Sequence, residues 1–254
     1  GATENIMMAA VLAKGTTIIR NAAKEPEIID LQNFLNGMGA RIKGAGMDTI
    51  RVEGVSLEDF RPVSHMVIPD RIEAGTFLAM VAATGGEVTL RNIIPEHVEA
   101  VVHKLREAGV RIQYADDGLT VIATRRPTAA DFKTLPYPGF PTDMQPQMMA
   151  LMSIADGTSI ITETVFESRF AVAAELRRMG GQIKTEGRTA VVKGVERLSG
   201  ATVTASDLRS GVALVLAGLV ATGCTVVEGV HHIQRGYETL ERKLRGLGAR
   251  IELE

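Results

Sequence analysis

The sequence predicts an α/β fold made of repeated βαβαββ units, with apolar helices inside and sheets outside. The motif Leu-x3-Gly-x2-Ile occurs four times, with its glycines 70, 71 and 68 residues apart. A glycine followed by a β-branched run precedes each motif by about twenty residues. A fixed period of this kind indicates a repeat architecture. The motif glycines are Gly39, Gly109, Gly180 and Gly248, and the preceding ones are Gly15, Gly86, Gly157 and Gly223.

Each unit opens with a helix that is apolar nearly all round, which indicates burial on every side. A glycine ends it, as a left-handed C-cap does. A short β-branched strand follows. The first helices are predicted at 6–13, 70–83, 143–155 and 207–221, and the strands at 17–19, 88–90, 159–162 and 225–227.

The second half of each unit is predicted as an amphipathic helix and two strands. The helix is clearest at 96–107 and 237–247, and the strand pairs at 41–43 with 48–52 and 182–184 with 189–193. A further strand is expected before units two to four, for example at 66–68 and 202–204. The strands alternate apolar and polar residues, which suits sheets with one wet face. Unit one lacks its first strand and unit four its last, so we expect a fragment.

Composition excludes several classes of function. A net charge of −2 leaves no overall basic surface for nucleic acid or an anionic membrane. The apolar stretch at 211–222 is too short to span a bilayer, and no signal peptide is visible. One cysteine, Cys224, allows no intrachain disulfide and suits a reducing, cytoplasmic compartment. We expect Cys224 to be a buried, inert thiol.

No cofactor and no metal are expected. The five histidines lack metal-ligand spacing with one another or with the cysteine. They are His65, His97, His103, His231 and His232.

Three aspartates stand where first helices begin: Asp70, Asp143 and Asp207. Aspartate is a favoured helix N-cap, and capping alone is one interpretation of all three. Asp143 differs because three prolines and a glycine precede it within 133–143. Such a stiff loop is typical of a site that aims one carboxylate. A structural turn is the alternative.

Charged residues also gather at corresponding ends of the units. Arg169, Arg209 and Arg235 are predicted to converge because the units repeat. A planar guanidinium donates two parallel hydrogen bonds to phosphate or carboxylate, and helix N-termini add positive potential. The alternative is three surface arginines in unrelated pairs.

At this point the sequence resembles the UDP-N-acetylglucosamine 1-carboxyvinyltransferases, over the whole chain and in order. The motifs are Gly-Phe-Pro-Thr-Asp143-Met-Gln, Glu163-Thr-Val-Phe-Glu167-Ser-Arg169-Phe, Asp207-Leu-Arg209, His232-Ile-Gln-Arg235-Gly-Tyr-Glu, Gly1-Ala-Thr, Glu25-Pro-Glu-Ile and Pro69-Asp70-Arg-Ile-Glu-Ala-Gly-Thr. It departs at Ser168, where Asn is usual, at Gln234, where Asp is usual, and at Ser210-Gly211, where Ala-Ser is usual.

The resemblance implies an inside-out α/β barrel fold of two domains, with an N-terminal part missing. Residues 1–64 would be the last unit of the first, catalytic domain, and residues 65–254 a second domain of three units. The reaction implied is transfer of the enolpyruvyl group of phosphoenolpyruvate to the 3-hydroxyl of UDP-N-acetylglucosamine, with release of phosphate. This is the first committed step of peptidoglycan precursor synthesis.

The resemblance also implies residue roles. Asp143 would bind the sugar and help to deprotonate its hydroxyl, and Arg235 would share in catalysis. Arg169, Arg209 and Arg235 would hold phosphoenolpyruvate, with nucleotide contacts from Gly1 and the Val165 backbone. The secondary polar residues of the cleft would be Glu25, Asp70, Glu167 and Asp207.

Two other functions stay open. One is the related enzyme that uses shikimate 3-phosphate, 3-phosphoshikimate 1-carboxyvinyltransferase. The other is a non-catalytic repeat scaffold, against which the charged unit openings argue. The partners expected are phosphoenolpyruvate and UDP-N-acetylglucosamine, without nucleic acid or membrane. We expect the 254-residue chain alone to be inactive.

Overall fold

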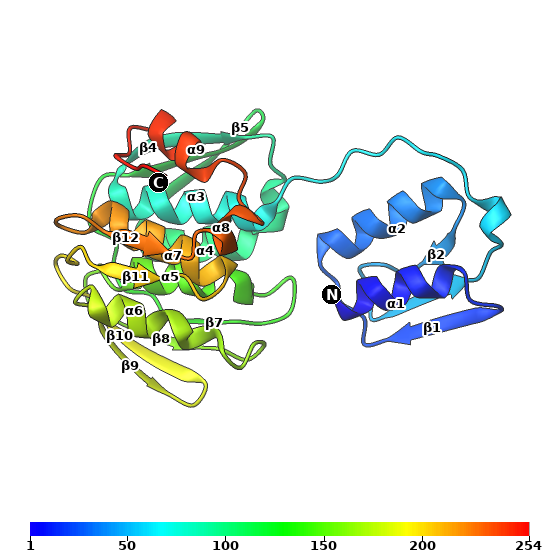
Figure 1. The fold of residues 1–254 in the computed structure, drawn as a ribbon, viewed down its shortest axis with the longest axis horizontal. Helices are drawn as coiled ribbons and strands as arrows, with labels where there is room; N and C mark the ends of the chain where they lie inside the picture. Colours follow the sequence, from blue (N-terminus) through cyan, green and yellow to red (C-terminus); the bar gives the residue numbers. More distant parts are fainter. Residues whose placement is uncertain (254) are drawn as a thin grey trace. The chain divides into compact units, whose positions relative to one another are not determined.

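A computed structural model describes residues 1–253 (Figure 1). The chain divides into two compact units. The first comprises Gly1–Pro69 with Pro136–Pro138, and the second comprises Asp70–Leu135 with the chain from Gly139 onward. Each unit buries its own cluster of hydrophobic side chains.

The first unit is one repeat around a three-stranded sheet. Its elements are α1 (Ala2–Val11), β1 (Thr16–Arg20), α2 (Pro26–Met38), β2 (Arg41–Lys43), β3 (Thr49–Glu53) and the 3-10 turn η1 (Leu57–Asp59). The sheet has the order β1-β3-β2 and is antiparallel throughout. Ile50 and Val52 of β3 are fully buried while their neighbours Thr49 and Arg51 are exposed, so one face of this sheet is wet.

The second unit contains three repeats. In chain order its elements are α3 (Arg71–Thr84), β4 (Gly86–Arg91), η2 (Pro95–Val98), α4 (Glu99–Glu107), β5 (Arg111–Ala115), β6 (Gly118–Ala123), β7 (Phe132–Lys133), η3 (Thr142–Met144), α5 (Gln145–Met152), β8 (Thr158–Thr162), η4 (Arg169–Ala171), α6 (Val172–Arg178), β9 (Gln182–Glu186), β10 (Thr189–Lys193), β11 (Thr202–Thr204), α7 (Leu208–Val220), β12 (Val226–Glu228), α8 (His231–Gln234) and α9 (Leu240–Gly246).

The sheets repeat one topology, which confirms the predicted unit. The orders β1-β3-β2, β4-β6-β5 and β8-β10-β9 are the same arrangement in three successive repeats. The additional leading strand is parallel where it forms, as in β7 beside β8 and β11 beside β12. The third repeat therefore has the full βαβαββ order.

The first helices of the second unit lie inside it, as their apolar sequences predict. α3, α5 and α7 contact one another, and Figure 1 shows them between the sheets of the unit. Every residue of α5 is buried, and so is α7 from Ser210 to Ala217. These side chains form the core, and the N-terminal ends of the helices carry the polar residues described below.

The four motif glycines share one backbone geometry. Each has a positive φ, between 86° and 117°, a region that glycine occupies without steric cost. In each repeat the N–H after the glycine donates to the carbonyl of the motif leucine: Ala40 to Leu35, Val110 to Leu105, Gly181 to Leu176 and Ala249 to Leu244. This is the Schellman helix end, and it explains why the motif recurs.

Several expectations are wrong. Residues 66–68 form no strand within the described part of the chain, and Met66 and Val67 are largely exposed. β4, whose counterparts β8 and β12 pair with a parallel leading strand, pairs here with β6 alone. The second helix of repeat four starts at Leu240 and not at 237, after Thr239 in a left-handed conformation.

Two burial expectations also fail. The helix α1 is buried on one face only, since Ile6, Met8 and Leu12 are about half exposed. Cys224 is exposed and lies in the turn that precedes β12. Its sheet has only two strands among residues 1–253.

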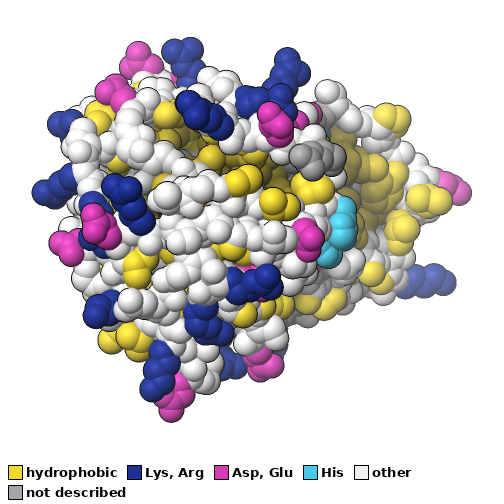
Figure 2. Space-filling model, turned by 60° about the vertical axis from the view of Figure 1, so that its left-hand side comes forward, with side chains coloured by type: hydrophobic (Ala, Val, Ile, Leu, Met, Phe, Trp, Pro, Cys, Tyr) yellow, Lys and Arg dark blue, Asp and Glu magenta, His cyan; other side chains and the backbone are white. Residues whose placement is uncertain are grey.

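The surface is mixed in charge. On the face drawn in Figure 2, Lys and Arg side chains are interspersed with Asp and Glu, consistent with the near-neutral net charge. Within residues 1–253 the helices are too short or too polar for any of them to cross a membrane.

Candidate active site

Asp143 lies inside the 3-10 turn η3, directly before α5. The N-cap of η3 is Pro141, and neither η3 nor α5 shows a side-chain cap hydrogen bond in the described structure. Pro146 in the first turn of α5 has no N–H. The Asp143 carboxylate is therefore free of capping and points at other side chains.

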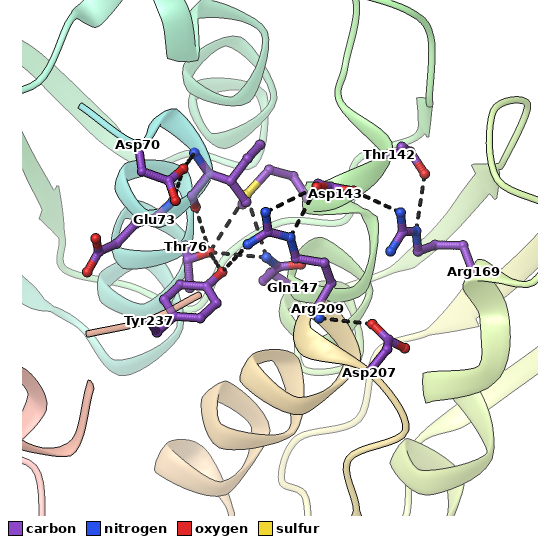
Figure 3. Close-up of polar contacts among 12 residues, drawn as sticks. Asp70, Glu73, Thr76, Thr142, Asp143, Gln147, Arg169, Asp207, Arg209 and Tyr237 are labelled. Atoms are coloured by element: carbon purple, nitrogen blue, oxygen red, sulfur yellow. Dashed lines mark hydrogen bonds and ion pairs between the residues drawn. The ribbon is translucent and has the colours of Figure 1, made fainter. Parts of the chain in front are cut away.

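Two arginines from different repeats hold Asp143 (Figure 3). Arg169 Nη2 donates to Asp143 Oδ1 at 2.8 Å. Arg209 donates to Oδ2 from Nε at 3.1 Å, and its Nη2 lies 3.1 Å from the same oxygen. The Arg169 and Arg209 side chains are only 10% and 14% exposed, whereas Asp143 is 37% exposed. The predicted convergence of arginines therefore holds for these two.

Thr142, next to Asp143, connects Arg169 to a buried carboxylate. Arg169 Nε donates to Thr142 Oγ1 at 3.2 Å, and Thr142 Oγ1 donates to Glu163 Oε2 at 2.9 Å. The Arg169 guanidinium also lies over the Phe166 ring, 4.4 Å from its centroid. Arg169 is thus held on three sides.

Glu163 organises the loop that carries Val165 and Arg169. It is 2% exposed, and its Oε1 accepts the backbone N–H of Val165 at 2.8 Å and that of Phe166 at 2.9 Å. Thr134 Oγ1 donates to the same oxygen at 2.7 Å. All four groups that contact this carboxylate donate to it, so the loop 163–166 is built around its negative charge.

Asp70 and Asp207 are helix caps, as one interpretation predicted. Asp70 accepts the N–H groups of Ile72 and Glu73 at the start of α3. Asp207 accepts those of Arg209 and Ser210 at the start of α7, together with the Ser210 hydroxyl at 2.5 Å. Any further role of these two carboxylates stays a prediction.

Asp207 and Arg209, at the N-terminus of α7, have surroundings that favour their charged forms. Burial raises the pKa of Asp207, but hydrogen bonds from Ser210 and the Arg209 N–H, and the charge of Arg169, outweigh it and hold the pKa below its ordinary value. Burial lowers the pKa of Arg209, but Tyr237 and Asp143 outweigh it and raise the pKa above its ordinary value. Both groups are therefore charged at neutral pH.

A buried hydroxyl network lies behind Arg209. Arg209 Nη1 donates to the Tyr237 hydroxyl at 3.3 Å, and that hydroxyl lies 2.9 Å from Thr76 Oγ1. Gln147 Nε2 donates to Thr76 Oγ1 at 3.1 Å. Figure 3 shows the chain of contacts running from Asp143 through Arg209 to α3.

The other predicted residues lie apart from these contacts. Arg235 follows α8, is exposed, and is not one of the two arginines that contact Asp143. Val165 and Glu167 are exposed on the loop after β8, where Arg188 contacts Glu167. In the first unit, Gly1 precedes α1 and Glu25 precedes α2. The roles of these residues stay predictions.

The arrangement can bind an anion. Two guanidinium groups share the Asp143 carboxylate, and the charged Asp207 also lies near Arg169, so these four groups together are neutral. Planar guanidinium groups suit phosphate and carboxylate oxygens. Asp143, partly exposed between them, can also accept a proton from a hydroxyl that reaches it.

Sequence reasoning missed Thr142, Tyr237, Thr76 and Gln147, and did not assign Glu163 a role. A signal existed for Thr142, which is adjacent to Asp143, and for Tyr237, which is two residues after Arg235. Thr76 and Gln147 lie inside apolar helices, where only tertiary contact distinguishes them from packing.

Comparisons with known proteins identify the family of the chain. The EPSP synthase family model (3-phosphoshikimate 1-carboxyvinyltransferase) matches residues 1–244. A UDP-N-acetylglucosamine 1-carboxyvinyltransferase 1 of Symbiobacterium thermophilum is 67% identical over 251 residues, 99% of this chain and 56% of the relative. One of Caldanaerobacter subterraneus subsp. tengcongensis is 60% identical over 99% of the chain and 60% of the relative. The chain thus spans about three-fifths of the length of these relatives.

Solved structures give the same fold. The enolpyruvyl transferase NikO from Streptomyces tendae superposes with a TM-score of 0.85 at 30% identity, over 99% of this chain and 60% of that one. EPSP synthase from Acinetobacter baumannii superposes with a TM-score of 0.70 at 18% identity, over 98% of this chain and 60% of that one, and shows the fold alone. With the family model matched from Gly1 almost to the end, the chain belongs to the EPSP synthase family of enolpyruvyl transferases.

Proposed function

We propose that this chain is part of an enzyme that transfers the enolpyruvyl group of phosphoenolpyruvate to the 3-hydroxyl of UDP-N-acetylglucosamine and releases phosphate. The observation that carries the proposal is the pair of guanidinium groups on Asp143, in a chain 54% to 67% identical to eight proteins named for this reaction. Phosphoenolpyruvate carries a phosphate and a carboxylate, which are the groups that arginines recognise.

The finer architecture belongs to the same proposal. Residues 65–254 would form a domain of three βαβαββ units arranged as an inside-out barrel, and residues 1–64 the last unit of a first, catalytic domain. The inner helices and outer sheets of the second unit support this arrangement.

In this proposal Asp143 is the proton acceptor. The sugar hydroxyl loses its proton to the Asp143 carboxylate as its oxygen bonds to C2 of phosphoenolpyruvate, while C3 gains a proton from a general acid in the part of the enzyme that this chain does not span. The conjugate base of that acid then takes a proton back from C3 as phosphate leaves C2, which gives the enolpyruvyl ether, and the proton held by Asp143 passes to the released phosphate. The partial exposure of Asp143, beside well-buried arginines, supports a role in contact with substrate.

Arg169, Arg209 and Arg235 would bind phosphoenolpyruvate and stabilise the anionic adduct, since fixed cations lower the energy of developing negative charge. Val165 would meet the nucleotide through its backbone, which Glu163 holds in place. Gly1 would contact the nucleotide as well, and Glu25, Asp70, Glu167 and Asp207 would be further polar groups of the cleft. The reaction needs no metal or cofactor in this scheme.

The proposed cellular role follows from the reaction. UDP-N-acetylglucosamine with an enolpyruvyl ether is a peptidoglycan precursor, so we place the enzyme at the first committed step of that synthesis. We expect it in the cytoplasm, with two small-molecule substrates and no nucleic acid or membrane partner.

Phosphate release tests the proposal. The chain is joined to the part of the Symbiobacterium thermophilum relative that it does not match, and phosphate is measured with phosphoenolpyruvate and either acceptor sugar. We expect release with UDP-N-acetylglucosamine. Release with shikimate 3-phosphate instead would favour the second candidate, the reaction for which the family model is named. Release with neither would leave a binding or scaffold role.

A further inference from the structure

Tyr237 is a buried residue whose hydroxyl makes two hydrogen bonds. It lies after α8, is 1% exposed, and its hydroxyl touches Thr76 of α3 and Arg209 of α7. Thr76 and Gln147 are fully buried as well. A phenylalanine would fill nearly the same space. The buried hydroxyl therefore calls for an explanation, because burying a polar group costs free energy unless the group is hydrogen-bonded.

Thr76 lies at the centre of this network. Its hydroxyl can donate to the Ile72 carbonyl at 2.7 Å. Gln147 Nε2 has only protons to offer Thr76. The Tyr237 and Thr76 hydroxyls lie 2.9 Å apart and either can donate to the other, while the Tyr237 oxygen accepts from Arg209 Nη1.

These contacts determine how Arg209 is held. Its Nε and Nη2 face Asp143 Oδ2, and its Nη1 faces the Tyr237 oxygen. Contacts on both edges of a planar guanidinium oppose rotation of the group.

We propose that Tyr237 is a positioning residue for the known family reaction: its hydroxyl, anchored on Thr76, fixes the plane of the Arg209 guanidinium on Asp143. The proposal deepens the function proposed above and rests on it for its kinetic part. Tyr237 does not itself touch the substrate in this scheme.

The protonation state of Tyr237 agrees with this role. Burial raises the pKa of the Tyr237 phenol, and although Arg209 and Thr76 lower it, the pKa stays above its ordinary value. The hydroxyl thus keeps its proton over the whole neutral range. No other ionisable group needs to change charge for the network to hold.

The test compares Tyr237→Phe with Tyr114→Phe. Tyr114 of β5 is exposed and its hydroxyl donates to Glu99 at 3.0 Å, so this control also deletes one tyrosine hydrogen bond, outside the network. The joined enzyme is this chain fused to the part of the relative that it does not match, as described above. In it, we expect Tyr237→Phe to lower kcat about ten-fold, the size of one lost hydrogen bond to a charged group, with little change in KM. Tyr114→Phe keeps the parent kcat and KM.

A second measurement reads the positioning without activity. Nitrogen-15 NMR of the 254-residue chain reports rotation of the Arg209 guanidinium through its Nη signals. We expect slow rotation in the parent and in Tyr114→Phe, and rotation at least several-fold faster in Tyr237→Phe. If the Tyr237 variant does not fold, Thr76→Val replaces it, since this change removes the anchor and keeps the volume. Its control is Thr76→Ser. We expect faster rotation of the Arg209 guanidinium in the valine variant than in the serine variant.

Each outcome has one meaning. Unchanged Arg209 rotation, or an unchanged kcat in an active Tyr237→Phe enzyme, would overturn the positioning role. If the parent joined enzyme releases no phosphate, the proposed function fails, and the NMR comparison alone then supports or overturns the hold of Tyr237 on Arg209.

Discussion

The starts of the inner helices differ in one respect that matters for function. At α3 and α7 the aspartate accepts backbone N–H groups of its own helix. At the start of α5 the corresponding Asp143 accepts from Arg169 and Arg209. Equivalent residues in a repeat can therefore cap their own helix in two units and pair with arginines in a third.

The backbone and the prolines around each aspartate explain the difference. Asp70 and Asp207 have extended backbones at the N-cap position. Asp143 is already inside the 3-10 turn that Pro141 begins, and Pro146 removes an N–H from the turn that follows. The proline-rich approach thus converts a cap position into one that faces Arg169 of the same repeat and Arg209 of the next.

The largest effect expected from this comparison concerns turnover. Asp143→Ala should lower the kcat of the joined enzyme by at least ~10²-fold, the size expected for a positioned acid–base group. Asp70→Ala, the matched cap variant, should lower the unfolding free energy by about 1 kcal/mol. It should lower kcat far less than Asp143→Ala does. Near-normal turnover in Asp143→Ala would show that the enzyme needs Asp143 for turnover no more than it needs Asp70.

The next effect concerns the arginine fork. Arg169→Lys keeps the charge but cannot reach both Asp143 and Thr142, so kcat/KM for phosphoenolpyruvate should fall roughly ten- to hundred-fold, as for one lost hydrogen bond between charged groups. Arg178→Lys, at an exposed residue of α6, is the control. Equal kinetics for the two variants would show that only charge counts at residue 169.

Stability should respond at Glu163. In Glu163→Gln an amide N–H₂ replaces one carboxylate oxygen and faces donors, so the unfolding free energy should fall by about 1–3 kcal/mol. Denaturant unfolding of the 254-residue chain measures this. Glu167→Gln, at a side chain that is 84% exposed, should change stability very little. A loss of the same size in both variants would contradict the role of Glu163 in the loop.

The smallest effect concerns acid. Because the folded pKa of Asp207 is lowered, its charge stabilises the fold above the unfolded pKa, and this stabilisation is lost as pH falls through the folded pKa. Asn also caps helices, so Asp207→Asn should be slightly less stable than the parent at pH 7 and approach it in acid. A constant difference between the two stability curves from pH 7 to pH 3 would contradict this assignment.

The sequence predicted the repeat because local rules determine it. The four glycine helix ends need a left-handed residue, and the buried helices need apolar side chains, so both leave a pattern. It also predicted that Arg169, Arg209 and Arg235 converge, since repeat positions map onto equivalent ends of elements, and the structure brings the first two together on Asp143.

The rest depends on contacts between distant residues. Tyr237 lies 161 residues from Thr76, and no periodicity marks that pair. The exposed face of α1 and the missing strand at 66–68 likewise depend on which neighbours pack there. Local pattern indicates which residues can be buried or paired, and tertiary structure decides which of them are.

The measurement that tests the central claim most directly is a double-mutant cycle on the 254-residue chain. Unfolding free energies are measured for the parent, Asp143→Asn, Arg169→Gln and the double variant. If the arginine holds Asp143, the two changes should be coupled by about 1 kcal/mol, above the limit of additivity for independent sites. Additive changes, within roughly 0.3 kcal/mol, would show that Asp143 and Arg169 act independently and would contradict the account.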